Sequence, residues 1–86
     1  MNEYTGLVKD MLKDIEMREE ISDALLKQID KNPVFKTELT NRIIEKVKKE
    51  GNDNFLYELL EQGIFDRPEL LEMANTAQIP LDLLKE

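Results

Sequence analysis

The sequence predicts an all-α protein, a compact bundle of four to six helices. Helix-forming residues dominate, and glycine and proline each occur only three times in 86 residues. No segment sustains the alternation of apolar and polar residues that a half-buried strand requires. We therefore expect a single helical domain over residues 1–86, with longer helices in residues 1–50 and short helices in residues 51–86.

The first stretch, from about Thr5 to Lys31, has two interpretations. Apolar residues at helical spacing share one face on either side of a polar gap at Arg18, Glu19 and Ser22. The chain forms either one long helix or a bent pair of helices. We favour a break near residues 16–19, giving helices of about 3–16 and 18–31. The apolar residues of this face are Leu7, Val8, Met11, Leu12, Ile15, Leu25, Leu26 and Ile29.

The pair Asn32-Pro33 predicts a helix boundary. Proline disfavours helix at the residue before it and suits the first turn of a new helix, and asparagine is a good N-cap. The next helix should run to about Glu50 and stop at Gly51. Its inward residues should be Leu39, Ile43, Ile44 and Val47.

Short helices should follow in the C-terminal part. Asn52 or Asp53 can cap a helix over residues 54–62, which Gly63 should end. Asp66 and Glu69 have the spacing of a capping box, and they predict the start of another helix.

The composition removes several classes of chemistry. The chain has no cysteine and no histidine, so it lacks thiolate ligands, disulfides and the commonest general base. Its single serine, Ser22, has no histidine to activate it. The glycines are isolated, so no phosphate-binding loop is predicted. We expect no enzymatic activity, no cofactor and no metal.

The net charge of −7 is unevenly distributed along the chain. Residues 1–50 carry 11 acidic and 10 basic side chains, whereas residues 51–86 carry 8 and 2. This asymmetry argues against phosphate binding by the C-terminal part and favours a basic protein partner. No apolar run reaches the roughly 18–20 residues that cross a bilayer, and no signal segment is predicted. We expect a cytoplasmic protein that does not enter a membrane.

Two charged stripes are candidate binding surfaces. Glu16, Glu19, Glu20 and Asp23 follow i, i+3, i+4, i+7 spacing, so a continuous helix would present them together to a basic partner. A solvated helix face is the simpler interpretation. A second stripe could contact phosphates or an acidic partner, or be ordinary exposed surface near a helix end. It consists of Arg42, Lys46 and Lys49.

The C-terminal end offers a third candidate. Residues 68–85 have the size of a helix-turn-helix, although the second helix is mostly apolar and has Asp82 and only one cation, Lys85. Apolar residues are in surplus over residues 55–84, which predicts either a core or an interface. Leu81, Leu83 and Leu84 are the candidate partner contacts at this end.

Together these patterns favour a small acidic regulator or inhibitor that docks on a larger macromolecule, in one version by masking a nucleic-acid-binding surface. Two alternatives stay open. One is a nucleic-acid-binding regulator that uses residues 68–85, and the other is a structural helical protein that self-associates, for example as a homodimer.

Overall fold

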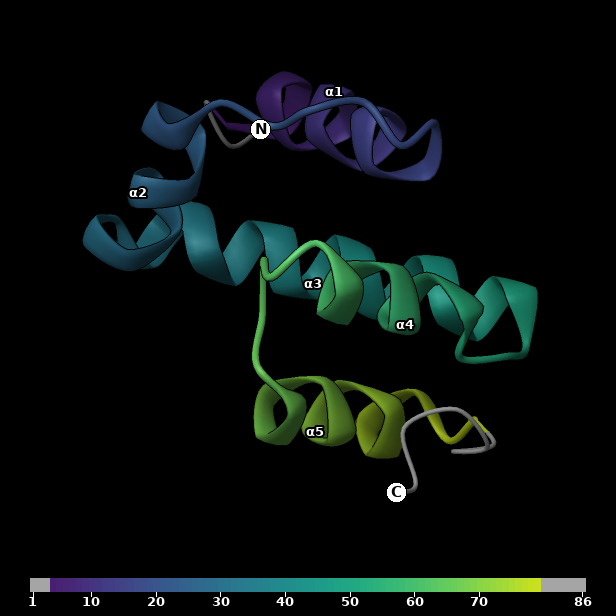
Figure 1. The fold of residues 1–86 in the computed structure, drawn as a ribbon. Coiled ribbons are helices and arrows are strands. Elements are labelled where there is room, and N and C mark those ends of the chain that lie inside the picture. The colour runs from purple at the N-terminus through teal and green to yellow at the C-terminus, as the bar shows by residue number, and fades with distance from the viewer. Residues whose placement is uncertain (1–3, 80–86) are drawn as a thin grey trace. The chain divides into compact units, whose positions relative to one another are not determined.

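The computed structural model describes residues 4–79, and these residues form five α-helices without a strand (Figure 1). The helices are α1 (Thr5–Glu16), α2 (Asp23–Lys31), α3 (Pro33–Glu50), α4 (Asn54–Glu61) and α5 (Arg67–Ala77). The all-α prediction is therefore confirmed. The chain divides into two units, Met1–Arg42 and Ile43–Glu86, so that the boundary between them falls inside α3.

The core of the first unit comes from one face of each of its helices. Residues at the predicted helical spacing are fully buried on α1, and Phe35, which the sequence pattern did not single out, is fully buried on α3. Leu7 departs from the prediction: it is 37% exposed, because it lies at the edge of the apolar face of α1. The buried apolar residues of this unit are Val8, Met11, Ile15, Ile29, Phe35 and Leu39.

A Schellman motif ends α1 and produces the predicted break. The backbone N–H of Arg18 donates to the carbonyl of Ile15 at 3.1 Å, and that of Glu19 donates to Asp14 at 2.8 Å. Arg18 lies in the left-handed region, with φ of 60°. The chain then runs extended through residues 19–22 and returns to α2 (Figure 1).

The expected start of the second helix at residue 18 is wrong. Residues 17–22 are not helical, and α2 begins only at Asp23. Ser22 has an extended backbone, and its Oγ accepts a hydrogen bond from the N–H of Leu25 at 3.3 Å. Serine is a favoured N-cap because its side chain satisfies one of the unpaired N–H groups of the first turn.

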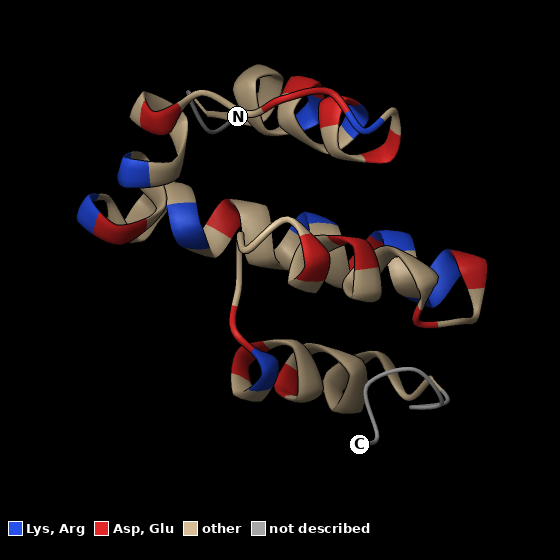
Figure 2. Cartoon of the chain, in the orientation of Figure 1, with Lys and Arg blue, Asp and Glu red and all other residues tan. Residues whose placement is uncertain are grey.

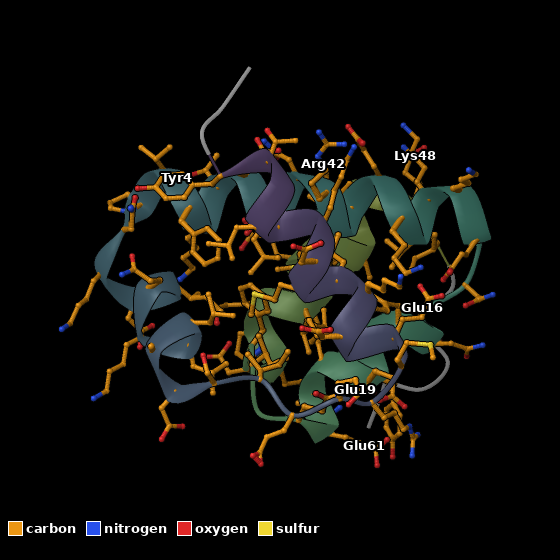
Figure 3. The ribbon with its side chains drawn as sticks, turned by 90° about the horizontal axis from the view of Figure 1, so that it is seen from above. Tyr4, Glu16, Glu19, Arg42, Lys48 and Glu61 are labelled. Carbon is orange, nitrogen blue, oxygen red and sulfur yellow. The ribbon has the colours of Figure 1, made fainter. Side chains whose placement is uncertain are left out.

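Asn32 joins α2, α3 and the N-terminal segment at one corner. Its Oδ1 accepts hydrogen bonds from the backbone N–H groups of Val34 at 3.1 Å and Phe35 at 3.2 Å, which confirms the predicted N-cap. Its Nδ2 donates to the hydroxyl of Tyr4. The Tyr4 ring meets the Phe35 ring edge-on, with centroids 5.5 Å apart, at the start of α3 (Figure 3).

The second unit contains the end of α3 together with α4 and α5. Helices α4 and α5 pack against each other. Gly51, with φ of 75°, ends α3, and its N–H donates to Val47. The side chain of Asn52 accepts from the N–H of Asn54 at 3.1 Å, whereas Asp53 occupies the N-cap position and is buried. The buried apolar residues are Ile43, Val47, Phe55, Leu56, Leu59, Phe65, Leu70, Met73, Ala74 and Ala77.

Both ends of α5 have well-defined caps. Asp66 and Glu69 form the predicted capping box, in which each side chain accepts from the backbone N–H of the other residue. At the other end, Gln78 adopts the left-handed region with φ of 57°. The N–H groups of Gln78 and Ile79 donate to the carbonyls of Asn75 and Ala74 in another Schellman motif. The last helical turn that we expected after Pro80 lies outside the described residues.

We predict that Asn32→Ala lowers the free energy of unfolding by about 1–2 kcal/mol, because it removes the cap of α3. Urea denaturation followed by circular dichroism measures this change. Asn32→Asp is the matched control, because it keeps an acceptor for the N–H groups of α3 and loses only the donor to Tyr4. A loss as large for Asn32→Asp as for Asn32→Ala would contradict the capping role.

We predict that Gln78→Gly stabilises the protein by about 0.5–1 kcal/mol, because glycine adopts positive φ without the steric cost of a Cβ atom. Asn75→Gly, inside α5, should instead destabilise the protein by a few tenths of a kcal/mol. Thermal unfolding of the two variants should therefore give shifts of opposite sign. A decrease for both variants would show that Gln78 has a compensating role in the fold.

Candidate functional site

An exposed, charged segment joins α1 and α2; we call it the connector and define it as residues 17–22 with the flanking Glu16 and Asp23. Glu16, Glu19, Glu20 and Asp23 are all exposed. Four carboxylates and one guanidinium give the eight residues a net charge of −3. Figure 2 shows the acidic colouring along this segment, and Figure 3 places Glu16 and Glu19 at the C-terminal end of α1.

The four carboxylates do not share one helix face. Glu16 is the last residue of α1, Asp23 is the first residue of α2, and Glu19 and Glu20 lie in the extended segment between them. The i, i+3, i+4, i+7 pattern is therefore a property of the sequence and not of a helix surface. The structure gathers these residues instead at the turn between two helices.

An exposed methionine lies within the connector. Met17 is 64% exposed, more than any other large apolar residue in the described part of the chain, and Ile21 is half-buried. In the sequence, Met17 and Ile21 fall outside the helical spacing of the residues on the apolar face. This offset is the sequence signal for an apolar side chain outside the core.

The basic stripe is largely engaged within the protein. Arg42 Nε lies 3.0 Å from an oxygen of Glu38, and Lys46 Nζ lies 3.0 Å from an oxygen of Glu50. The Lys46 ammonium also lies 5.0 Å from the centroid of the Phe55 ring on α4. Lys49 is exposed. Arg42 and Lys46 thus have carboxylate partners one helical turn away. These carboxylates reduce the positive charge with which the stripe could bind phosphates.

The C-terminal candidates are described only in part. Leu81, Leu83 and Leu84, and with them the second helix of the predicted helix-turn-helix, lie outside the described residues. Within residues 55–79, most of the apolar surplus is core rather than surface. Phe55, Leu56, Leu59, Phe65, Leu70 and Met73 are buried, and Leu60, Ile64, Leu71 and Ile79 are half-buried.

The first half of α3 carries two shallow hollows that the sequence did not predict, with linings that are mainly neutral but include Lys36 and Glu38. Val34 is 55% exposed. The two hollows share Pro33 and Thr37 as lining residues. Thr40 and Asn41 line one of the hollows. The sequence signal for this surface is a set of neutral residues at helical spacing, among which Lys36 and Glu38 are interspersed.

Residues 4–79 also bear on metal binding and membrane insertion. This part of the chain contains no group of three or more Asp or Glu residues arranged to hold a metal ion. None of its helices combines the length and apolar content needed to cross a membrane.

No protein-family model, curated protein or solved structure matches this chain. Function must therefore be inferred from the chemistry of the described surfaces.

We predict that Lys46→Ala lowers the free energy of unfolding by about 0.5–1.5 kcal/mol, because it removes both the pair with Glu50 and the cation–π contact with Phe55. Lys49→Ala removes the same charge from the same helix and should change stability by less than about 0.5 kcal/mol. Urea denaturation of both variants at low and high salt checks this difference. Equal effects of the two substitutions would mean that neither the Glu50 pair nor the Phe55 contact of Lys46 contributes measurably to stability.

Proposed function

We propose that this protein is a small, non-catalytic regulator or inhibitor that acts in the cytoplasm by docking its connector on a larger protein. The docking surface of the partner would be basic and would contain an apolar pocket. The single observation that carries the proposal is the exposed Met17 among the carboxylates of Glu16, Glu19, Glu20 and Asp23.

The two kinds of side chain supply different parts of recognition. Burying a methionine side chain contributes about 1.5–3 kcal/mol, and methionine adapts its shape to irregular pockets. Carboxylates at the rim of an interface raise the association rate and select basic partners more than they add affinity. Micromolar binding requires about 8 kcal/mol, so the partner must also contact surface beyond the connector.

The conformation of the connector favours binding because both of its ends are fixed. The Schellman motif holds residues 18 and 19 against the last turn of α1, and the Ser22 cap fixes the entry into α2. Binding by a segment that is already ordered loses less conformational entropy than binding by a flexible loop. The segment is thus suited to a rigid docking role.

The charge of the connector also bears on the nucleic-acid alternative. Phosphates repel carboxylates, and Arg42 and Lys46 already face Glu38 and Glu50. The same charge suits a protein that itself binds nucleic acid, because such a partner offers a basic surface. Masking of that surface is the version of the proposal that we favour.

The proposal predicts which peptides the protein selects from a random peptide library. Selected sequences should combine Lys or Arg with an apolar residue, and their affinity should fall as salt increases. The double variant Glu19→Lys/Glu20→Lys should weaken binding by roughly tenfold or more, because it replaces attraction by repulsion. Isothermal titration with a selected peptide measures the change.

A matched control changes the charge equally elsewhere. Asp30 and Glu72 are exposed on α2 and α5, so Asp30→Lys/Glu72→Lys alters the net charge by the same amount without touching the connector. This variant should keep at least about half of the affinity, because screening weakens distant charges. Failure to select any basic peptide, or equal losses for both double variants, would refute the proposal.

A further inference from the structure

The three methionines in the described part of the chain differ sharply in exposure. Met17 is 64% exposed, whereas Met11 is fully buried and Met73 is 4% exposed. A thioether reacts with an oxidant only when the oxidant can reach the sulfur. A buried methionine reacts through transient openings of the structure, and the rarity of these openings lowers its rate.

We propose that Met17 is a site of reversible oxidation, at which a peroxide converts the thioether to a sulfoxide. The regulatory consequence rests on the proposed function: oxidation would replace the apolar centre of the connector by a polar group and weaken docking. The connector would then bind its partner under reducing conditions and release it under peroxide stress.

The reaction is balanced without a metal or cofactor. The sulfur lone pair of Met17 attacks one oxygen of the peroxide, an S–O bond forms and the O–O bond breaks. With hydrogen peroxide, the second oxygen takes up the transferred proton and leaves as water. Sulfur loses two electrons and the peroxide gains them. Methionine sulfoxide reductases reverse the change. The electrons come from a cellular thiol reductant, which is oxidised to a disulfide.

The position of Met17 allows this change without loss of the fold. Its backbone N–H donates to Lys13 at 2.9 Å, and the cap that follows consists of backbone hydrogen bonds from Arg18 and Glu19. The side chain contributes little to the core, because most of its surface faces solvent. A sulfoxide at this position is therefore solvated, whereas a sulfoxide at Met11 would be buried among apolar side chains.

The first test is the rate of oxidation at each methionine of the full chain in hydrogen peroxide, measured by peptide mass mapping. Met17 should be oxidised at least roughly tenfold faster than Met11 and Met73. In concentrated urea the three rates should become similar, because unfolding exposes all three sulfurs. Native rates within about twofold of one another would overturn the assignment. Met1 lies outside the described residues and is followed separately.

Met17→Leu tests whether oxidation acts through this sulfur. Leucine keeps a similar apolar volume and cannot be oxidised. Circular dichroism of the oxidised parent chain should match that of the untreated chain, and Met11 and Met73 should react at the same rates in Met17→Leu as in the parent. Loss of helical signal on oxidation of Met17 alone would show a structural role and overturn the proposal.

The affinity for the peptide selected with the connector tests the regulatory consequence separately. Peroxide should weaken binding of this peptide to the parent chain by roughly fivefold or more and leave Met17→Leu unchanged. Unaltered affinity of the oxidised parent would overturn the switch. If no peptide is selected, the proposed function fails, whereas the oxidation rates still decide whether Met17 is the preferred site.

Discussion

Two backbone hydrogen bonds, from Arg18 and Glu19 back to Ile15 and Asp14, end α1, and the organisation of the first unit follows from them. Without this break, the apolar pattern over residues 5–31 could continue as one helix, and the carboxylates would lie on one face. Like charges at that spacing repel by a few tenths of a kcal/mol per pair. The break places Glu19 and Glu20 in the segment between the helices, and it separates Glu16 at the end of α1 from Asp23 at the start of α2.

Helix ends show most clearly how far the sequence predicts this fold. Gly51 and Gly63 identified the ends of α3 and α4, because glycine adopts positive φ readily, and both residues have φ near 70°. Arg18 and Gln78 adopt the same region without being glycine. Their residue type carries no signal for that conformation. The end of α1 at Glu16 agrees with the expected bound of about 16, but the start of α2 at Asp23, and with it the length of the connector, could not be predicted from the sequence.

Local patterns predicted local features well. The Asn32 cap and the Asp66–Glu69 capping box depend on residues within three positions of one another, and both are present. The contact between Lys46 and Phe55 joins two helices. It depends on tertiary packing, which the helical periodicity of the sequence does not specify.

For the candidate site, the sequence identified four acidic residues that prove to be exposed. The shared helix face that a continuous helix would have given them is absent, because the helix breaks where the sequence favoured a break. The degree of exposure of Met17 emerged from the structure, because residues 17–22 prove to be non-helical although a helix was expected from residue 18.

Because backbone groups alone make the Schellman cap of α1, the side chains at positions 17, 19 and 20 are under little selection for folding. Mutations there should drift freely in a lineage unless another molecule constrains them. The turn is thus a place where a new binding specificity could evolve at small risk to the fold. Homologues that keep the methionine and the acidic pair while the rest of the sequence diverges would indicate such a constraint.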